Sequence, residues 1–362
     1  MDIRFGYWST TLGGLVKSKL PQRTDWTFEF NTQIAQVAET VGFDYILVAA
    51  RFISNYGKSN QLDALSTVAA LSTLTKRLKL IAAVHSGLWH PGAIAKQTST
   101  IDYISGGRFC INVLSGWYRQ EFHTYGEPWL DHDERYRRSE EFIQVLKGLW
   151  TEDNFNFQGD FYRIHEGWLR PRPLSQPYPE IFQGGNSKAA RRMAARYSDW
   201  YFMNGNSLEE VQQQVEEISI LAKDYGRRLK FGLNAFIIVR DSEAEAYAEL
   251  ERIIAHADVE SVNAFAEQVK QAGASTQDRI GMWANSDFAN LVQPNDGFKT
   301  GLIGTAEQVA EKIRAYHAIG VDMILCAFLH YADELAAFGH TVIPLVRQLE
   351  SERSPTLLDP VV

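Results

Sequence analysis

Apolar residues recur along the chain in short continuous runs, and each run is followed by a longer stretch with helical spacing. The first four runs cover residues 3–8, 43–49, 78–84 and 108–114, and helices are predicted between them over 27–40, 62–75 and 92–104. Strands made of unbroken apolar runs are typical of parallel sheets, because both faces of such sheets are covered. The first half of the chain therefore predicts a parallel α/β architecture.

The same alternation continues in the second half. Further strands are predicted over 180–183, 199–202, 230–239 and 321–328, with helices over 187–196, 207–224, from about 242, over 305–318 and over 333–350. No glycine fingerprint for dinucleotide binding follows the first strand, which disfavours an open nucleotide-binding sheet. We therefore predict a single (β/α)8 TIM barrel over residues 1–350 and a loosely held tail over 351–362.

Two segments depart from this rhythm. Residues 154–179 combine a hairpin signature around Gly159-Asp160 with a proline-rich run, and they follow an amphipathic helix predicted over 134–150. From about 257 to 303 the apolar periodicity is lost, and glycines and prolines are frequent. Long irregular stretches inside a compact domain are usually lids or binding loops. We therefore predict two insertions, of which residues 257–303 form a mobile lid.

Composition and charge exclude several classes of protein. The 362 residues carry a formal net charge of −8, which disfavours a general nucleic-acid surface. Apolar runs are too short for a membrane span, and no signal peptide is visible, so we expect a cytoplasmic protein. The two cysteines, Cys110 and Cys326, lie in predicted buried strands and are expected to be core residues. The acidic run 131–134 does not face one way on a helix, so no metal site is predicted.

Residues 105–123 contain a polar side chain inside a buried strand. Asn112 interrupts the apolar run 108–114, and a loop rich in polar residues opens at the strand's carboxyl end. A buried amide must find a partner or cost about 1–3 kcal/mol. Asn112 is therefore either a core residue bonded to neighbouring backbone or a residue that faces a ligand. In a barrel the ligand site lies at the carboxyl ends of the strands, where aromatic and amide residues gather in this sequence.

The stretch QGGNS, residues 183–187, joins a strand to an alanine-rich helix. Backbone amides at the start of that helix would point at an anion, helped by the helix dipole. Phosphate sites of barrels commonly lie in this region. The alternative is an ordinary strand-to-helix turn in which Ser187 only caps the helix.

Several motifs together resemble a known family. NVLSGWYRQEF (112–122), DHDERYRRSEEF (131–142), GDFYR (159–163), IFQGGNS (181–187) and NDGFKTGLIGT (295–305) resemble the two-component, reduced-flavin-dependent monooxygenases of the luciferase-like superfamily. The resemblance extends to about residue 350. It implies a barrel that binds FMN as FMNH2, delivered by a separate NADH- or NADPH-dependent flavin reductase, and uses O2 as cosubstrate. It also implies a homo-oligomer, either a dimer or a tetramer.

The resemblance assigns roles to residues at the strand ends. Flavin contacts are expected from Ala50, Arg51, Asn112, Glu121, Arg135, Tyr136, Gly184, Gly185, Asn186 and Ser187. Apolar walls of the catalytic pocket are expected from Trp8, Trp117, Phe236 and Phe328, and hydrogen bonds to the substrate or to activated oxygen from Asn234 and His330. Phe52 stands near a position that holds cysteine in a sister branch.

The substrate follows from the branch of the family. The resemblance is strongest to members that cleave the C–S bond of dimethylsulfone to methanesulfinate and formaldehyde in sulfur assimilation. Members that act on alkanesulfonates carry two arginines and a histidine where this chain has Asn234, Phe236 and Gln293. Fewer fixed cations favour a small neutral organosulfur substrate. Alternatives are an alkanesulfonate such as methanesulfonate or another organosulfur substrate, a deazaflavin-dependent hydride-transfer enzyme, and a catalytically silent flavin-binding subunit.

Overall fold

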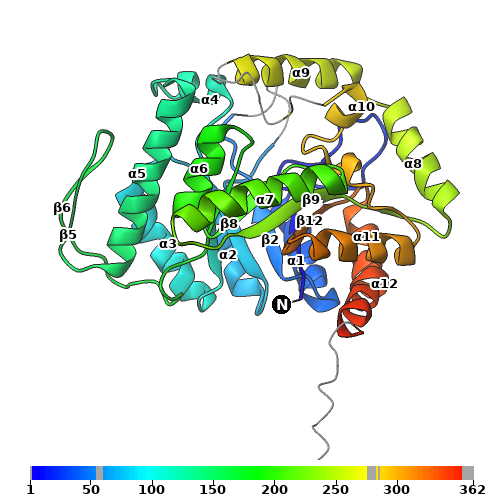
Figure 1. Cartoon of the computed structure of the whole chain (residues 1–362), viewed down its shortest axis with the longest axis horizontal. Coiled ribbons are helices and arrows are strands. Elements are labelled where there is room, and N and C mark those ends of the chain that lie inside the picture. The colour runs from blue at the N-terminus through cyan, green and yellow to red at the C-terminus, as the bar shows by residue number, and fades with distance from the viewer. Residues whose placement is uncertain (1, 54–59, 275–282, 284–285, 353–362) are drawn as a thin grey trace, which may run out of the picture.

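A closed barrel of eight parallel strands forms the centre of the protein, and helices surround it (Figure 1). The computed structural model describes residues 2–53, 60–274, 283 and 286–352, with the backbone alone at 272–274. Around the barrel the strands follow the order β1, β12, β9, β8, β7, β4, β3 and β2, and β2 pairs with β1. The predicted eight-stranded β/α barrel is confirmed.

The barrel strands are β1 (Arg4–Trp8), β2 (Tyr45–Val48), β3 (Lys79–His85), β4 (Phe109–Leu114), β7 (Ile181–Gly184), β8 (Trp200–Met203), β9 (Lys230–Phe236) and β12 (Met323–Ala327). The helices around them are α1 (Phe28–Val41), α2 (Ala64–Leu74), α3 (Pro91–Ser105), α5 (His132–Thr151), α6 (Lys188–Tyr197), α7 (Leu208–Asp224), α8 (Glu243–Ala255), α11 (Ala306–Ala318) and α12 (Tyr331–Ser351). These bounds agree with the predicted ones within two residues, except that the strand expected over 230–239 is divided into β9 and β10 (Ile238–Val239).

Four short elements and one long helix were not predicted. The short ones are α4 (Arg119–Thr124), α10 (Phe288–Leu291) and β11 (Ile303–Gly304), and a 3-10 helix, η2, covers Gly297–Thr300. The long helix is α9 (Val259–Ala274), which lies across the top of the barrel in Figure 1. The expectation that periodicity fails from 257 onward is therefore wrong for α9. Its buried stripe is narrow, with Val262 and Phe265 buried between exposed positions, so the pattern is weak.

The hairpin expected within residues 154–179 is formed by β5 (Phe155–Gln158) and β6 (Arg163–Gly167), which pair antiparallel (Figure 1). Most of the expected tail, residues 353–362, lies outside the described residues, as does part of the expected lid, at 275–282 and 284–285. Among the described residues, no helix is both long and apolar enough to cross a bilayer.

Aromatic side chains fill the middle of the barrel. Phe182 stacks on Trp200, with ring centroids 5.2 Å apart and planes 9° apart, and on Phe202 at 5.1 Å. Gly232 on β9 makes room for this stack, because a Cβ there would lie 2.6 Å from the Phe202 ring. These residues come from alternate positions of adjacent strands, as the pleat of a sheet requires. The stack separates the two ends of the barrel.

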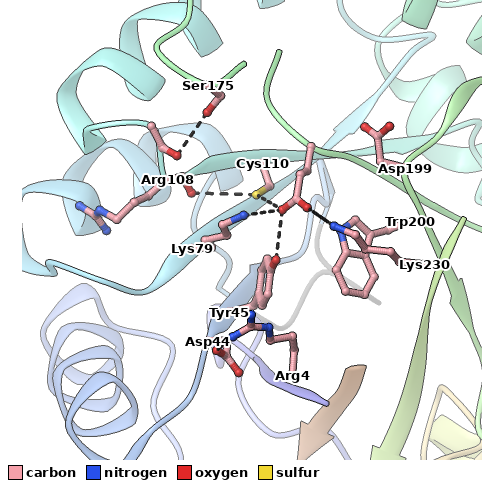
Figure 2. Close-up of polar contacts among 12 residues, drawn as sticks. Arg4, Asp44, Tyr45, Lys79, Arg108, Cys110, Ser175, Asp199, Trp200 and Lys230 are labelled. Atoms are coloured by element: carbon pink, nitrogen blue, oxygen red, sulfur yellow. Dashed lines mark hydrogen bonds and ion pairs between the residues drawn. The ribbon is translucent and has the colours of Figure 1, made fainter. Parts of the chain in front are cut away.

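The amino-terminal end of the barrel is closed by a polar cluster around Glu180, and its partners Tyr45, Lys79, Trp200 and Lys230 are labelled in Figure 2. The Glu180 carboxylate accepts hydrogen bonds from Lys79 at 2.7 Å and from Lys230 at 2.8 Å. Trp200 Nε1 and the Tyr45 hydroxyl donate to it as well, each at 3.1 Å. Cys110 lies beside the cluster as a buried free thiol, and Cys326 is buried and free elsewhere in the core, so both cysteines are core residues as predicted.

Candidate functional site

A cavity of about 300 Å³ opens at the carboxyl ends of the barrel strands, beneath α9. Strand ends and the loops after them provide most of its wall, including Trp8, Ala50, Arg51, Asn112, Ser115, Gly116, Trp117, Gly184, Gly185, Asn186, Ser187, Phe202, Asn204 and Asn234. Phe265, Gln268, Trp283, Pro294 and Asn295 of the covering segment also line it. The cavity lies where barrel enzymes bind their substrates. Among the described residues of its wall, none is an aspartate or glutamate.

The turn between β7 and α6 has the geometry of an anion site. Ser187 is the N-cap of α6, and its hydroxyl accepts a hydrogen bond from the Ala190 amide at 3.2 Å. Gly185 has φ +130°, and a Cβ there would lie 2.8 Å from the Tyr136 hydroxyl, so only glycine fits without displacement. Tyr136 on α5 hydrogen-bonds Ser187; burial raises the pKa of Tyr136 more than this bond lowers it. A neutral phenol, a serine and helix amides therefore converge on one point.

Asn186 belongs to this turn through its backbone. Its side-chain oxygen accepts hydrogen bonds from Arg191 at 2.7 Å and from Gln214 at 3.2 Å, both on the helices behind the turn. The Tyr201 hydroxyl donates to the Gly185 carbonyl and fixes the turn from the barrel side. The four predicted residues 184–187 therefore all line the cavity, with Asn186 held by its neighbours.

Asn112 decides between the two interpretations of the polar residue in β4. It is 6% exposed, lines the cavity, and its Oδ1 atom has no hydrogen-bond partner among the described residues. A core asparagine bonded to neighbouring backbone would show such a partner. The unpaired oxygen favours the interpretation that Asn112 faces a ligand.

Arg51 is held over an aromatic surface at the β2 end. Its guanidinium lies 4.6 Å from the Trp117 ring centroid, and its NH1 atom is 3.5 Å from Oε2 of Glu121. Glu121 on α4 is fully buried behind Arg51, and its Oε1 accepts a hydrogen bond from the Phe52 amide at 2.9 Å. The expected flavin contact of Glu121 is therefore corrected: its carboxylate holds Arg51 and lies outside the cavity wall.

His85, 3.6 Å from the same carboxylate, is neutral in this setting. Burial, helped by the charge of the nearby Arg51, lowers the pKa of His85 to about 3, so its contact with Glu121 is not an ion pair. The pKa of Glu121 is raised because burial outweighs the attraction of Arg51. Among the three buried side chains Arg51, Glu121 and His85, Arg51 is therefore the one cation and Glu121 the one carboxyl group.

Arg135 also lies outside the cavity wall, although a flavin contact was expected from it. Its guanidinium donates to the carbonyls of Gly116 at 3.2 Å and Leu130 at 2.8 Å. The guanidinium carbon lies 4.0 Å from the centroid of the Trp129 ring. Adjacent residues on a helix point about 100° apart. Tyr136 faces the cavity, so Arg135 cannot share its direction, and it fixes the loop after β4 instead.

Trp8 and Asn234 form a bonded pair at the cavity wall. Trp8 Nε1 donates to Asn234 Oδ1 at 2.8 Å, and Asn234 Nδ2 donates to the Met203 carbonyl at 2.6 Å. These bonds fix the indole ring and use the amide oxygen of Asn234. Trp117, the other expected wall residue that lines the cavity, packs on Trp283 with ring centroids 5.5 Å apart.

The other expected catalytic residues lie elsewhere. Successive residues of a strand face opposite sides of the sheet, and on β12 Met323 and Leu325 face the barrel interior. Phe328 therefore faces the helices, where its ring packs on Phe338 with centroids 5.8 Å apart. Phe236 is covered by η2, whose Phe298 packs on it at 5.1 Å. Both are therefore absent from the cavity wall.

Phe52 and His330 are displaced sideways from the cavity. Phe52 packs against Tyr125 at 5.7 Å, in the loops beside α4. His330 is the N-cap residue of α12, where its amide donates to Glu334 at 3.0 Å. Neither residue lines the cavity. The backbone amide of each donates to a glutamate of the neighbouring helix: Phe52 to Glu121 on α4, and His330 to Glu334 on α12.

Lys17 lines the cavity and was missed by sequence reasoning. It lies on the loop after β1, and its Nζ atom is 4.0 Å from the Phe265 ring centroid. Burial lowers the pKa of Lys17 to about 7, and the charge of Arg51 contributes in the same direction. Its position after a barrel strand was a signal that could have identified it. Arg51 was expected at the cavity as a flavin contact, whereas Lys17 is a cation of the wall that the comparison with the alkanesulfonate branch did not consider.

Comparison with known proteins identifies the family. A family model described as luciferase-like monooxygenase matches residues 4–323. The chain belongs to this family. It is 55% identical over 352 residues to an FMNH(2)-dependent dimethylsulfone monooxygenase of Pseudomonas putida, covering 97% of both chains. A protein of the same name from Pseudomonas fluorescens (strain Pf0-1) is 52% identical, covering 97% of this chain and 96% of the relative.

Solved structures of other proteins share the fold. DmoA from Hyphomicrobium sulfonivorans superposes with a TM-score of 0.80 at 19% identity, covering 97% of this chain and 89% of that one. The long-chain alkane monooxygenase LadA gives 0.81 at 21% identity, covering 97% and 92%. The family predicted from the sequence motifs is confirmed by the family model and by the two similar relatives.

Proposed function

We propose that the chain is a two-component monooxygenase that uses FMNH2 and O2 to cleave dimethylsulfone. The supporting observation is 55% identity over nearly the whole length to a relative named for that activity. The overall reaction would convert dimethylsulfone, O2 and FMNH2 to methanesulfinate, formaldehyde, FMN, water and a proton. Bound FMNH2 would supply the two electrons that reduce the second oxygen atom of O2 to water.

The described residues fit such a flavin. The β7–α6 turn, with Ser187 and Tyr136, would hold the phosphate, because its donors converge at a helix start. Asn112 offers an unpaired oxygen to an N–H group of the ring system. Ala50 lines the same wall. Glycine at 185 leaves the space that a phosphate group requires.

The remaining wall would orient the sulfone and exclude water. Trp8, fixed by Asn234, and Trp117 present apolar surface to methyl groups. The aromatic stack of the barrel interior seals the floor. Excluding water protects a reactive oxygen species and strengthens polar interactions with the substrate. The covering segment that includes α9 would complete this enclosure, and its closure on ligand binding stays a prediction.

A second candidate is an alkanesulfonate substrate. The observation in its favour is that Lys17 and Arg51 line a wall without a described carboxylate. A sulfonate entering a dry cavity loses hydration worth several kcal/mol unless cations replace the water. The identities of 55% and 52% to two relatives named as dimethylsulfone monooxygenases favour the neutral substrate.

The test is an aerobic assay in which an NADH-dependent flavin reductase supplies FMNH2. Dimethylsulfone and methanesulfonate are compared at equal concentration, with formaldehyde and methanesulfinate or sulfite quantified. We expect formaldehyde and methanesulfinate in equal amounts from dimethylsulfone. Equal or faster turnover of methanesulfonate would contradict the proposal. A cytoplasmic location and a dimeric or tetrameric state are further parts of the proposal, checked by fractionation and light scattering.

A further inference from the structure

One side of the cavity carries a cation that the proposed flavin and sulfone contacts do not use. The Lys17 backbone is tethered at both ends: its amide donates to the Val292 carbonyl at 2.8 Å, and its carbonyl accepts from the Asp258 amide at 2.9 Å. These bonds tie the loop after β1 to the end of α10 and to the residue before α9. The side chain then extends over Phe265 into the cavity. Among the described residues, no hydrogen bond or ion pair reaches Lys17 Nζ.

A second cation, Arg51, lies on the same side of the cavity, so the positive charge of Lys17 is not balanced there. Its one described carboxylate partner is Glu121, 3.5 Å away and also engaged with the Phe52 amide. Lys17 lies over Phe265 and Arg51 over Trp117, and these two rings pack together with centroids 6.1 Å apart, so both cations face the same part of the cavity. The charge of Arg51 lowers the pKa of Lys17. Two cations therefore share one carboxyl group. Unpaired charge in a partly buried place is costly unless an anion binds there during the reaction.

The flavin phosphate does not account for this charge. The proposed phosphate turn follows β7, whereas Lys17 follows β1 and Arg51 follows β2. In the barrel order β1 is separated from β7 by β12, β9 and β8, and β2 is separated from it by β3 and β4. The cations are thus on the opposite side of the barrel from the phosphate turn. A second anion is needed.

The chemistry of a sulfone supplies one. We propose that Lys17 and Arg51 form an anion subsite that binds the sulfinate group as it leaves; this rests on the proposed function. In hydroxymethyl methyl sulfone, the oxidised substrate, the hydroxyl loses its proton to water and the C–O bond becomes the carbonyl of formaldehyde. The C–S electron pair departs with sulfur, giving methanesulfinate. A neutral substrate becomes an anionic product at this step, and the two cations stabilise the charge that develops.

The test measures binding of methanesulfinate without turnover. The protein carrying oxidised FMN, whose ring system is neutral, is titrated with methanesulfinate by calorimetry. Lys17→Met removes the charge at nearly constant length, and Lys17→Arg restores it. Lys19→Met is the matched control, because Lys19 lies on the same loop and is exposed. We expect Lys17→Met to weaken sulfinate binding at least about tenfold, while Lys17→Arg stays within about threefold of the unmodified protein.

The KM for dimethylsulfone should change less than about threefold in Lys17→Met, because the neutral sulfone has no charge to lose. Unchanged sulfinate affinity in Lys17→Met would overturn the proposal, and so would undetectable binding by the unmodified protein at millimolar sulfinate. Weaker binding of FMNH2, measured anaerobically, with sulfinate affinity intact would assign Lys17 to the flavin ring and also overturn it. Failure of the proposed function is separate: the unmodified protein would then release no formaldehyde from dimethylsulfone.

Discussion

The two ends of the barrel differ in whether their buried polar groups have hydrogen-bond partners. At the amino-terminal end, Glu180 is surrounded by two lysines, a tyrosine and a tryptophan, all within 3.1 Å (Figure 2). At the carboxyl end, the side-chain oxygen of Asn112 has no hydrogen-bond partner, and Lys17 has no counterion, within the part of the chain that the structure describes. The aromatic stack of Phe182, Trp200 and Phe202 lies between the two ends.

The difference separates groups that stabilise the fold from groups that are reserved for ligands. Satisfied polar groups at the bottom of a barrel hold the strands together, whereas the top binds and transforms substrates. An unpaired polar atom lowers stability, so its presence at the top indicates a partner that arrives with the ligand. Substitutions at the bottom should therefore change stability, and those at the top should change binding.

The largest expected effect is at the bottom. Glu180→Gln keeps the shape of the side chain but leaves Lys79 and Lys230 without their counter-charge. Removing one partner of a buried ion pair costs about 3–5 kcal/mol, and about 2–3 kcal/mol is expected here. The lower value applies because the lysine side chains are 39% and 42% exposed and can reach water. Urea unfolding measures the loss, and FMN affinity should be unchanged.

The pH dependence of the stability difference between the unmodified protein and Glu180→Gln serves as a control. Burial raises the pKa of Glu180, but Lys79 and Lys230 lower it more, to about 2. A carboxyl group with a depressed pKa contributes stability above its unfolded pKa of about 4.5 and loses it as the pH falls toward the folded value. The stability gap between the unmodified protein and Glu180→Gln should narrow from pH 4.5 to 2. A constant gap would show that the charge of Glu180 is not responsible.

The next effect is at the top, on flavin binding. Tyr136→Phe combined with Ser187→Gly removes two hydroxyls from the proposed phosphate site. Glycine is chosen at 187 because it costs an N-cap only a few tenths of a kcal/mol. FMN affinity should fall about ten- to hundredfold, or roughly 1.4–2.7 kcal/mol. Fluorescence titration with FMN measures the change.

Ser242→Gly is the matched control for this double variant. Ser242 caps α8 in the same manner, with its hydroxyl accepting from the Glu245 amide at 3.2 Å, but it lies outside the cavity wall. Its FMN affinity should equal that of the unmodified protein. If the double variant binds FMN normally, the phosphate lies elsewhere and the β7–α6 turn is only structural.

The barrel could be predicted from the sequence because its signals are local. The strands are short, mostly apolar runs, and the helices carry apolar stripes, several of them with a side-chain cap such as Thr27 before α1 or Asp63 before α2. The anion turn was likewise visible, since glycines and Ser187 stand between a strand and a helix. These features depend on neighbouring residues along the chain.

The direction of single side chains could not be predicted with the same certainty. Whether Phe328 faces the cavity or the helices depends on where the pleat of β12 begins, and a shift of one residue reverses the answer. Lys17 reaches the cavity because hydrogen bonds to Val292 and Asp258 fold its loop inward. Such contacts join distant parts of the chain, and no local pattern contains them. The sequence comparison at Asn234, Phe236 and Gln293 therefore left Lys17 out, while the neutral substrate drawn from it stays part of the proposal.

The smallest effect concerns Asn112 and distinguishes the two ends most directly. Replacing it with leucine, a side chain of similar size, removes the unpaired oxygen and adds apolar contact inside the barrel. If the amide is kept only for a ligand, Asn112→Leu should stabilise the flavin-free protein by about 1 kcal/mol while weakening FMN binding about fivefold. Thermal unfolding with and without FMN measures both quantities on one sample. A loss of stability without FMN would mean that Asn112 supports the fold, and the two ends of the barrel would then follow the same rule.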